Sequence, residues 1–542
     1  MKLSSFPPSS GIAVQPNVRC LAGLYGSLKD SSMEDLNRLL EEDQDEQEIL
    51  RYAINHEESD EVRFLVGSQS LKPQGSQITL VTLVESLDID LKKQIFSHPD
   101  GEIISLVTLA SKPDWFISLF ASYSSERPEL RTGARIWRIP SSNESSLDDE
   151  ENESNSPKSL LDHNSSTLNS STLEYVTTLP LDKFCGIKRI TSHPSTTCLD
   201  LACIVGPPTE LPGSNAYPSL ITTSTTSYLV ILQAPSDSNS GDYEISTSSQ
   251  LYLPPSSTTD GLRSNMKLSS SCLSATVSPN AIRWSPHEQL NQIAMAFDNG
   301  ILGWDVRSMK PCFWMENAHW PCVRDLDYNP HRPNLLLSGG DDGILRIWDL
   351  RYLRTRYRCL STPANTGNMI NTTIPNASER IMQFGTEPTV QPLYALSSHS
   401  HWIWSVRYHP TRDQLVLSSG SDGRVCLYNL PSYSSDAMNE DIINEVNPQS
   451  IVDHCETTAA TTTTNVQNEV DNHSICSNEE ENDVNKDGLI ARLEQHEESV
   501  YAAEWSPVDA WYFASISYDG NFLLNRVPET IKLNILLQSK DY

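Results

Sequence analysis

Three segments of the chain repeat the same residue types at the same internal spacing. They are His319 to Trp348, His399 to Tyr428 and His496 to Asn525. In each one a serine follows the histidine by 19 residues, an aspartate follows the serine by 4, and the closing residue follows the aspartate by 6. Because three agreements at three offsets hardly arise by chance, the chain contains a structural repeat, and the repeat limits the fold more than the length does.

Between these markers each segment has the pattern of three antiparallel strands. An alternating apolar strand precedes an Asn-Pro, His-Pro or Ser-Pro turn, and a second strand, a Gly/Asp turn and a third strand follow. Period-two alternation broken by turn residues predicts antiparallel β-structure. A repeat of about 40 to 45 residues that ends in Trp-Asp is typical of propeller blades. Trp304 lies 44 residues before Trp348, which is one blade.

Four weaker copies bring the number of blades to seven. They are Ala281 to Asp305, which lacks the histidine; Glu102 to Trp137; Lys188 to Leu232; and a first copy with strands at 62–66 and 77–84. We therefore predict an all-β fold, a single seven-bladed WD-repeat β-propeller over residues 11–537. Its interior strands carry mainly apolar and small residues, which predicts a channel without a catalytic set.

Five stretches interrupt the repeats without a clear strand pattern. They are an acidic insert at 27–60, with a helix expected around 33–53, inserts at 140–172, 235–271 and 431–487, and a polar insert at 352–392. Segments this rich in polar and acidic residues bury too little apolar surface to offset the entropy of ordering. We expect them to be disordered loops between or within blades.

Charge and cysteine usage exclude several classes of protein. Lys and Arg number 39 against 70 Asp and Glu, a net charge of −31, which repels phosphate backbones and anionic lipids. No stretch approaches the roughly 20 apolar residues of a membrane span, and the first residues lack the apolar region of a signal peptide. The 11 cysteines form no Cys-x-x-Cys pair, as expected of free thiols in a reduced compartment. We predict a cytoplasmic protein that binds neither nucleic acid nor the membrane interior.

The repeated residues have a mechanical role. An aspartate can accept from the histidine and from turn N–H groups, a serine can donate to the histidine, and a tryptophan N–H can donate to the serine, so that one hydrogen-bonded chain joins three strands. We call this set the structural lock. Its predicted members are His319, Ser338, Asp342 and Trp348; His399, Ser418, Asp422 and Tyr428; and His496, Ser515 and Asp519. Asn525 cannot fill the space of the tryptophan, which predicts a softer last blade.

Catalytic interpretations of the same residues are weaker. His, Ser and Asp could form a hydrolytic triad, but an enzyme needs one such site and this set recurs in three blades. His399 and His401 could be a metal pair, but His399 occupies the lock position. The sequence has no Gly-rich phosphate loop. We predict no enzyme activity, no metal and no cofactor.

Several stretches are specific enough to indicate a family. The chain resembles the EARP and GARP complex-interacting proteins, a WD-repeat family, from about Val62 to Leu537. The stretches are Arg63–Lys72; Arg283–His287 with Gly303–Met309; Val323–Pro330; His399–Tyr408 with Asp413–Leu417; and Ser515–Gly520 with Asn525–Pro528. The chain departs from the family in its long inserts and its weak third blade.

The resemblance implies a protein-interaction scaffold. It implies binding to two vesicle-tethering complexes, the endosome-associated recycling complex and the Golgi-associated retrograde complex, in endosomal recycling and endosome-to-Golgi retrograde transport. The expected protein is a monomeric propeller, peripheral to the trans-Golgi network and endosomes, whose partners are protein subunits of these complexes. The family supplies no catalytic residues.

Two sets of aligned residues are candidates for partner binding. Arg324, Trp404 and Tyr501 each follow the apolar residue that begins the first strand of a blade, and Asp341, Ser421 and Tyr518 each precede the lock aspartate. Arg, Trp and Tyr are enriched in interface hot spots. The alternative is that Trp404 only packs between blades.

A rival function comes from two short motifs. Trp304-Asp305-Val306-Arg307 and Trp348-Asp349-Leu350-Arg351 fit the Trp-Asp-x-Arg pattern by which some WD-repeat proteins dock on the adaptor of a cullin-RING ubiquitin ligase. The chain would then be a substrate receptor of that ligase. An arginine near an acidic turn is also common on protein surfaces that bind no such adaptor, so the motif alone is a weak signal.

Overall fold

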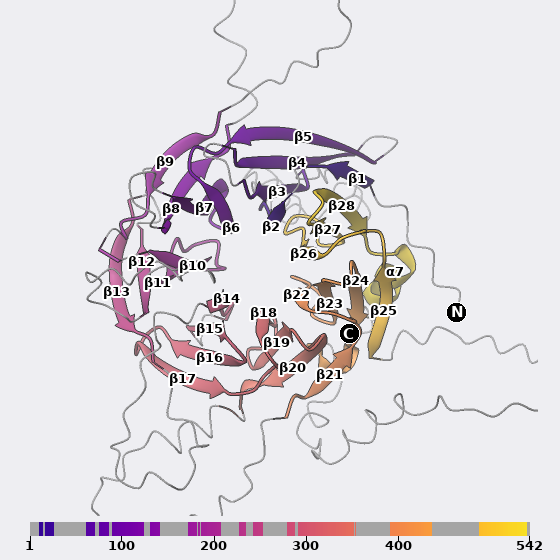
Figure 1. Ribbon diagram of the computed structural model, residues 1–542. Helices are drawn as coiled ribbons and strands as arrows, with labels where there is room; N and C mark the ends of the chain where they lie inside the picture. Colours follow the sequence, from indigo (N-terminus) through magenta and orange to yellow (C-terminus); the bar gives the residue numbers. More distant parts are fainter. Residues whose placement is uncertain are drawn as a thin grey trace, which may run out of the picture.

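The described residues form seven four-stranded antiparallel sheets around a central channel (Figure 1). The structure is a computed structural model that describes residues 10–14, 17–26, 61–70, 75–85, 89–123, 130–140, 172–181, 183–184, 186–206, 227–234, 242–252, 279–287, 291–351, 353, 391–435 and 487–538. Each sheet is one blade, and its strands run in chain order from the channel outward in blades 1 to 6. The prediction of a seven-bladed β-propeller is confirmed.

The first three blades follow one another around the ring. Blade 1 has β2 (Val18–Gly23), β3 (Arg63–Ser68), β4 (Gln77–Glu85) and β5 (Ile89–Ser97); blade 2 has β6 (Glu102–Leu109), β7 (Lys112–Tyr123), β8 (Leu130–Arg138) and β9 (Glu174–Thr178); blade 3 has β10 (Ile187–Ser192), β11 (Leu201–Val205), β12 (Tyr228–Gln233) and β13 (Glu244–Gln250).

The next three blades have the same order. Blade 4 has β14 (Pro279–Trp284), β15 (Gln292–Phe297), β16 (Gly300–Asp305) and β17 (Lys310–Met315); blade 5 has β18 (Val323–Tyr328), β19 (Leu335–Gly340), β20 (Ile344–Asp349) and β21 (Tyr394–Ser397); blade 6 has β22 (Ile403–Tyr408), β23 (Leu415–Gly420), β24 (Val425–Asn429) and β25 (Gly488–Leu493).

Blade 7 takes its strands from both ends of the chain. Its inner strands are β26 (Val500–Trp505), β27 (Tyr512–Ser517) and β28 (Asn521–Arg526), and its outer strand is β1 (Ser10–Ala13), which pairs antiparallel with β28. This pairing closes the ring and covers the edge that β28 would otherwise expose. A helix, α7 (Glu529–Gln538), follows β28 and buries Ile531 and Ile535 against the core between blades 6 and 7.

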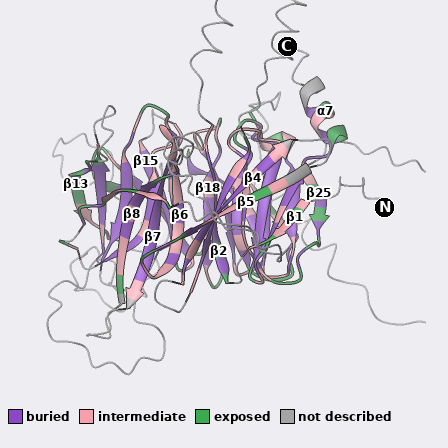
Figure 2. Cartoon of the chain, turned by 90° about the horizontal axis from the view of Figure 1, so that it is seen from above, coloured by how far each residue is buried: buried purple, intermediate pink, exposed green. Residues whose placement is uncertain are grey.

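Burial is greatest at the second strand of a blade and least at the outer strand, and Figure 2 shows exposed residues on the outer strands β13 and β25. The second strands β15, β19, β23 and β27 are buried at every residue, because they pack against the neighbouring blades on both faces. The outer strands alternate or are largely exposed, as in β13 and β21. An outer strand needs few apolar side chains, so its sequence carries little strand signal.

The structure corrects three boundaries of the predicted blades. The innermost strand of blade 1 is β2, which precedes the stretch 27–60, so that this stretch lies inside a blade. The stretch 235–271 contains β13, whose Ser- and Thr-rich sequence resembles a loop although it pairs with β12 along six residues. A short 3-10 helix, η1 (Pro431–Tyr433), begins the stretch 431–487. The helix expected around 33–53 lies outside the described residues.

The lock residues of blades 5 and 6 are joined by hydrogen bonds. In blade 5, His319 Nδ1 lies 2.8 Å from Asp342, Nε2 lies 2.7 Å from Ser338 Oγ, and Trp348 Nε1 donates to Ser338 at 2.8 Å. In blade 6 the corresponding distances are 2.9 Å for His399–Asp422 and 2.7 Å for His399–Ser418, and the Tyr428 hydroxyl lies 2.8 Å from Ser418. The tyrosine thus makes the contact that the tryptophan makes in blade 5.

The lock histidines of blades 5 and 6, His319 and His399, differ in pKa. In blade 5 the Arg346 guanidinium lies 2.6 Å from both Asp342 and the imidazole of His319. Burial, and to a smaller extent Arg346, lower the pKa of His319 in spite of Asp342. The position of Arg346 is taken by Cys426 in blade 6. Burial lowers the pKa of His399 too, but the hydrogen bonds with Asp422 and Cys426 outweigh it and raise the pKa to about 9.

Blade 7 departs from the predicted lock. His496 Nε2 lies 2.8 Å from Ser515 Oγ, but Nδ1 is buried without a hydrogen bond. Asp519, expected to hold this histidine, instead accepts from Ser517 and from the Asn521 side chain. Both amide atoms of Asn525 are buried and unsatisfied. Unpaired buried polar groups destabilise a fold, which agrees with the expected softness of this blade.

One lock was missed by the sequence analysis. In blade 2, His98 Nε2 lies 2.9 Å from Ser118 Oγ, Trp137 Nε1 donates to Ser118 at 2.8 Å, and His98 Nδ1 lies 3.1 Å from the Asp100 carbonyl. Ser118 and Trp137 are 19 residues apart instead of 10, since β7 and β8 are long and a longer connection joins them. The altered spacing hid the pattern, although the His–Ser separation of 20 residues was a usable signal.

No helix in the described part of the chain is long and apolar enough to span a membrane. Among the same residues, no group of three or more His, Cys, Asp or Glu side chains could hold a metal ion. The cysteines at 20, 203 and 426 are buried free thiols.

Replacing Trp348 by alanine should lower the free energy of unfolding by about 3–5 kcal/mol, because a large buried aromatic side chain and its bond to Ser338 are lost. Trp320→Ala is the matched control, since the Trp320 side chain is 71% exposed and it should leave stability nearly unchanged. Denaturant unfolding of both variants measures the difference. Equal stabilities would contradict the placement of Trp348 in the core.

Removing residues 1–14 should lower the melting temperature by several degrees, because β28 loses its partner strand and the ring opens. Removing residues 1–9 leaves β1 intact and serves as the control. Thermal unfolding followed by circular dichroism compares the two truncations. If both melt at the same temperature, β1 does not close the ring.

Candidate partner-binding face and central channel

All seven innermost strands have a β-bulge near their first residue, at the same end of the channel; it falls at the second residue in six strands and at the third in β6. The shift in register occurs at Val18/Cys20, Ile103/Ser105, Ile187/Arg189, Pro279/Ala281, Val323/Asp325, Ile403/Ser405 and Val500/Ala502. The bulged residues are Arg19, Ile104, Lys188, Asn280, Arg324, Trp404 and Tyr501. A bulge leaves one residue unpaired and re-aims its side chain. Six of these side chains line the channel cavity at its mouth, whereas Lys188 is buried in blade 3 and donates to Ser227.

The two sets of predicted partner-binding residues contact each other in pairs. Arg324 donates to both carboxylate oxygens of Asp341, at 2.5 and 3.0 Å. Trp404 Nε1 donates to Ser421 Oγ at 2.5 Å. The rings of Tyr501 and Tyr518 lie 5.9 Å apart. Arg324, Trp404 and Tyr501 are thus each contacted by a residue of the turn between the second and third strands of the same blade.

The bulged residues of blades 5, 6, 7 and 1 also form one continuous stack. The Arg324 guanidinium lies 4.8 Å from the ring centre of Trp404, Trp404 and Tyr501 are 4.9 Å apart, and Arg19 lies 4.8 Å from the ring centre of Tyr501. Trp404 does pack between blades, but it does so at the channel mouth and remains half-buried. Cation–π and aromatic contacts of this kind hold side chains in place before a partner binds.

Exposed aromatic side chains extend this surface. Trp320 and Trp402 are 71% and 38% exposed and precede the innermost strands of blades 5 and 6, and Tyr518 is 41% exposed. Arg324 lies 4.9 Å from the ring centre of Trp402. We call the surface made by Trp320, Arg324, Trp402, Trp404, Tyr501 and Tyr518 the aromatic face. Sequence reasoning missed Trp320 and Trp402, although each follows a histidine of the repeat by one or three residues.

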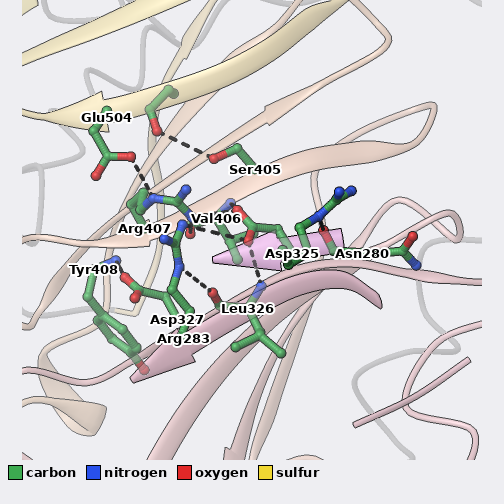
Figure 3. A network of polar contacts seen from close by, with 12 residues as sticks. Asn280, Arg283, Asp325, Leu326, Asp327, Ser405, Val406, Arg407, Tyr408 and Glu504 are labelled. Carbon is green, nitrogen blue, oxygen red and sulfur yellow. Dashed lines mark hydrogen bonds and ion pairs between the residues drawn. The ribbon is translucent and has the colours of Figure 1, made fainter. Parts of the chain in front are cut away.

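The channel below this face is charged, which corrects the expectation of apolar and small inner strands. It holds a cavity of about 500 Å³ lined by residues of all seven innermost strands. Arg407 donates to Asp325 at 2.5 Å and to Glu504 at 2.7 Å (Figure 3). Asp327, Arg407 and Glu504 occupy the same position in three aligned repeats, so a charged layer could have been found from the alignment.

Asp327 lies in this charged layer and accepts from the Tyr408 N–H at 2.9 Å. Loss of water contacts raises the pKa of Asp327 to about 6, although Arg283 and Arg407 oppose the increase. Figure 3 shows the carboxyl group beside these two arginines. The ionised carboxylate is therefore less favourable in the folded chain than in the unfolded one.

Asp327→Asn should raise the melting temperature at pH 8, and the gain should shrink as the pH falls below about 6. The pKa of the Asp327 carboxyl group is near 4 in the unfolded chain and about 6 in the folded chain. Between these two pH values only the folded chain binds the proton, so the wild type becomes more stable as the pH falls through this range. Asp325→Asn is the control on the same strand and should be destabilised at pH 8, since Arg407 loses its partner. Thermal unfolding from pH 4.5 to 8 measures both. A gain for Asp327→Asn that does not change with pH would disprove the titration.

The two Trp-Asp-x-Arg motifs lie at the other end of the third strands. Arg351 donates to both oxygens of Asp349 in its own motif, at 3.1 Å to Oδ1 and 2.7 Å to Oδ2, so the two charges are paired within the chain. The Arg307 side chain is exposed, and its backbone N–H donates to Asp305.

Comparisons with known proteins agree with this fold. The family model "WD domain, G-beta repeat" matches residues 311–349 and 390–429, in blades 4 to 6. "EARP and GARP complex-interacting protein 1" of Rattus norvegicus is 31% identical over 480 residues, and that of Homo sapiens is 30% identical over 480 residues. An "EARP-interacting protein homolog" of Danio rerio is 29% identical over 490 residues. Each alignment covers 89% of this chain and 94% of the relative. The chain therefore belongs to the family of EARP and GARP complex-interacting proteins.

Proposed function

We propose that this chain is a non-catalytic scaffold that binds the endosome-associated recycling complex and the Golgi-associated retrograde complex. It acts in endosomal recycling and endosome-to-Golgi retrograde transport. The names of its relatives describe interaction with EARP and GARP complexes, which supports the choice of partner. The partners are protein subunits of the two complexes, and the propeller is a cytoplasmic monomer, peripheral to the trans-Golgi network and endosomes. Its net charge of −31 disfavours nucleic acid as a ligand.

The observation that carries this proposal is the aromatic face. Arginine and aromatic side chains are the residue types that dominate binding energy in protein interfaces. Here Arg324 is fixed between Trp402 and Trp404 and is also held by Asp341, so little side-chain entropy is lost on binding. The aromatic face is therefore pre-organised for a protein partner.

The cullin-adaptor hypothesis has weaker support. The two motifs do not present the same docking group, because Arg351 is paired with Asp349 while the Arg307 side chain is exposed. An adaptor recovered with the wild type and lost on mutation of Arg307 and Arg351 would support that alternative.

The combined variant Arg324→Ala, Trp404→Ala and Tyr501→Ala should reduce recovery of tethering-complex subunits at least about tenfold, since each hot-spot truncation costs at least ~2 kcal/mol. Affinity purification of the tagged full chain, followed by mass spectrometry, measures recovery. The matched control replaces three exposed side chains of the outer rim, Tyr175, Leu489 and Leu533, by alanine. If the first variant is folded and recovers as much complex as the control, the aromatic face is not the binding surface.

A further inference from the structure

The channel mouth is basic although the chain is strongly acidic. Five arginines and three carboxylates line the cavity, in a chain with a net charge of −31. The arginines are Arg19, Arg189, Arg283, Arg324 and Arg407, and the carboxylates are Asp325, Asp327 and Glu504. A cleft with low-dielectric walls focuses the field of such an excess charge.

Three of the five arginines are balanced by acidic side chains. Arg407 pairs with Asp325 and Glu504. Arg283 lies 3.8 Å from Asp325, and Arg324 is held by Asp341. These ion pairs neutralise the middle of the channel and the mouth at blade 5.

The other two arginines, Arg19 and Arg189, form no ion pair with a carboxylate among the described residues. Arg189 donates only to backbone carbonyls, of Asn280 at 3.0 Å and of Lys188 at 2.9 Å. The Arg19 side chain is exposed and lies over the ring of Tyr501. Burial raises the pKa of the nearby Cys20 thiol to about 12; the charges of Arg189 and Arg19 oppose that rise, and the charge of Glu102 adds to it.

Much of the acidic charge of the chain lies in three stretches that connect strands. The stretches 27–60, 141–171 and 436–486 have net charges of −9, −6 and −11. They connect β2 to β3, β8 to β9 and β24 to β25, and these connections leave the blades at the end of the channel away from the bulges. The described residues at the mouth have no such excess of acidic charge, so the field there attracts an acidic partner.

We propose that Arg19 and Arg189 bind carboxylate side chains of an acidic peptide segment of the protein partner at the channel mouth, with Trp404 and Tyr501 as the adjoining wall. This inference rests on the proposed binding of a tethering complex through the aromatic face. Carboxylates match the chemistry because a guanidinium group offers them two parallel N–H donors. Arg19 is the bulged residue of β2, and Arg189 directly follows the bulged residue of β10, so both guanidinium groups lie at the mouth of the channel.

The test uses the full chain and two readouts. A fluorescein-labelled hexaglutamate peptide is titrated by anisotropy, with hexaglutamine and hexalysine peptides for comparison, and tethering-complex recovery is measured in parallel. The variants are Arg19→Glu with Arg189→Gln, and the charge-preserving pair Arg19→Lys with Arg189→Lys. Arg138→Gln with Arg307→Glu is the control for net charge at the other end of the third strands. Thermal unfolding shows that each variant is folded.

We expect hexaglutamate to bind the wild type and the lysine variant, and the Arg19→Glu and Arg189→Gln variant to bind it at least about tenfold more weakly, with a matching loss of complex recovery. The affinity should fall with salt, because the Debye length shrinks to about 3 Å at 1 M. The inference is overturned if the Arg19→Glu, Arg189→Gln variant binds hexaglutamate as tightly as the control variant Arg138→Gln, Arg307→Glu. Intact complex recovery by the charge-reversed variant would overturn it as well, while the proposed function stands. If the wild type binds hexaglutamate but recovers no tethering-complex subunits, the proposed function is refuted. The assignment of the acidic segment to a tethering complex is then refuted as well.

Discussion

The antiparallel pairing of Ser10–Ala13 with Asn521–Leu524 joins the two ends of the chain, and the ring depends on it. A propeller has no central element to hold its blades, so each blade is positioned only by its neighbours and by closure of the circle. The aromatic face is made by blades 5, 6, 7 and 1, which spans this junction. At this junction Arg19 of blade 1 lies over the ring of Tyr501 of blade 7.

Within the ring, the blades differ in how well their buried polar groups are satisfied. Blades 2, 5 and 6 have a histidine, a serine and an aromatic donor in one hydrogen-bonded chain. Blade 7 retains only the His496–Ser515 contact, and in blade 4 the indole N–H of Trp304 is buried without a partner. Stability is thus uneven around the ring, and the blade completed by β1 is among the less satisfied. The fold tolerates this because the second strands of the blades are buried on both faces.

One irregularity of the backbone supplies the candidate site. A bulge near the first residue of every innermost strand turns six side chains toward the channel mouth, and the ring brings residues far apart in sequence into one stack. Arginine and aromatic residues at four successive positions make a surface suited to protein binding. Arg19 and Arg189, which form no ion pair with a carboxylate among the described residues, add positive charge next to this surface in a chain whose net charge is −31.

The sequence by itself determined the repeat, the all-β class, seven blades and the equivalence of Arg324, Trp404 and Tyr501, because these depend on spacing and alternation along single strands. It did not reveal β13 or β1, since an outer strand needs few apolar residues, nor the lock of blade 2, where a longer connection altered the spacing. Only the tertiary structure decided that Asp519 turns away from His496, that Arg19 joins the stack and that Asp325 and Glu504 share Arg407. These contacts join residues of different blades or depend on the shape of one turn, and local sequence patterns carry no information about either.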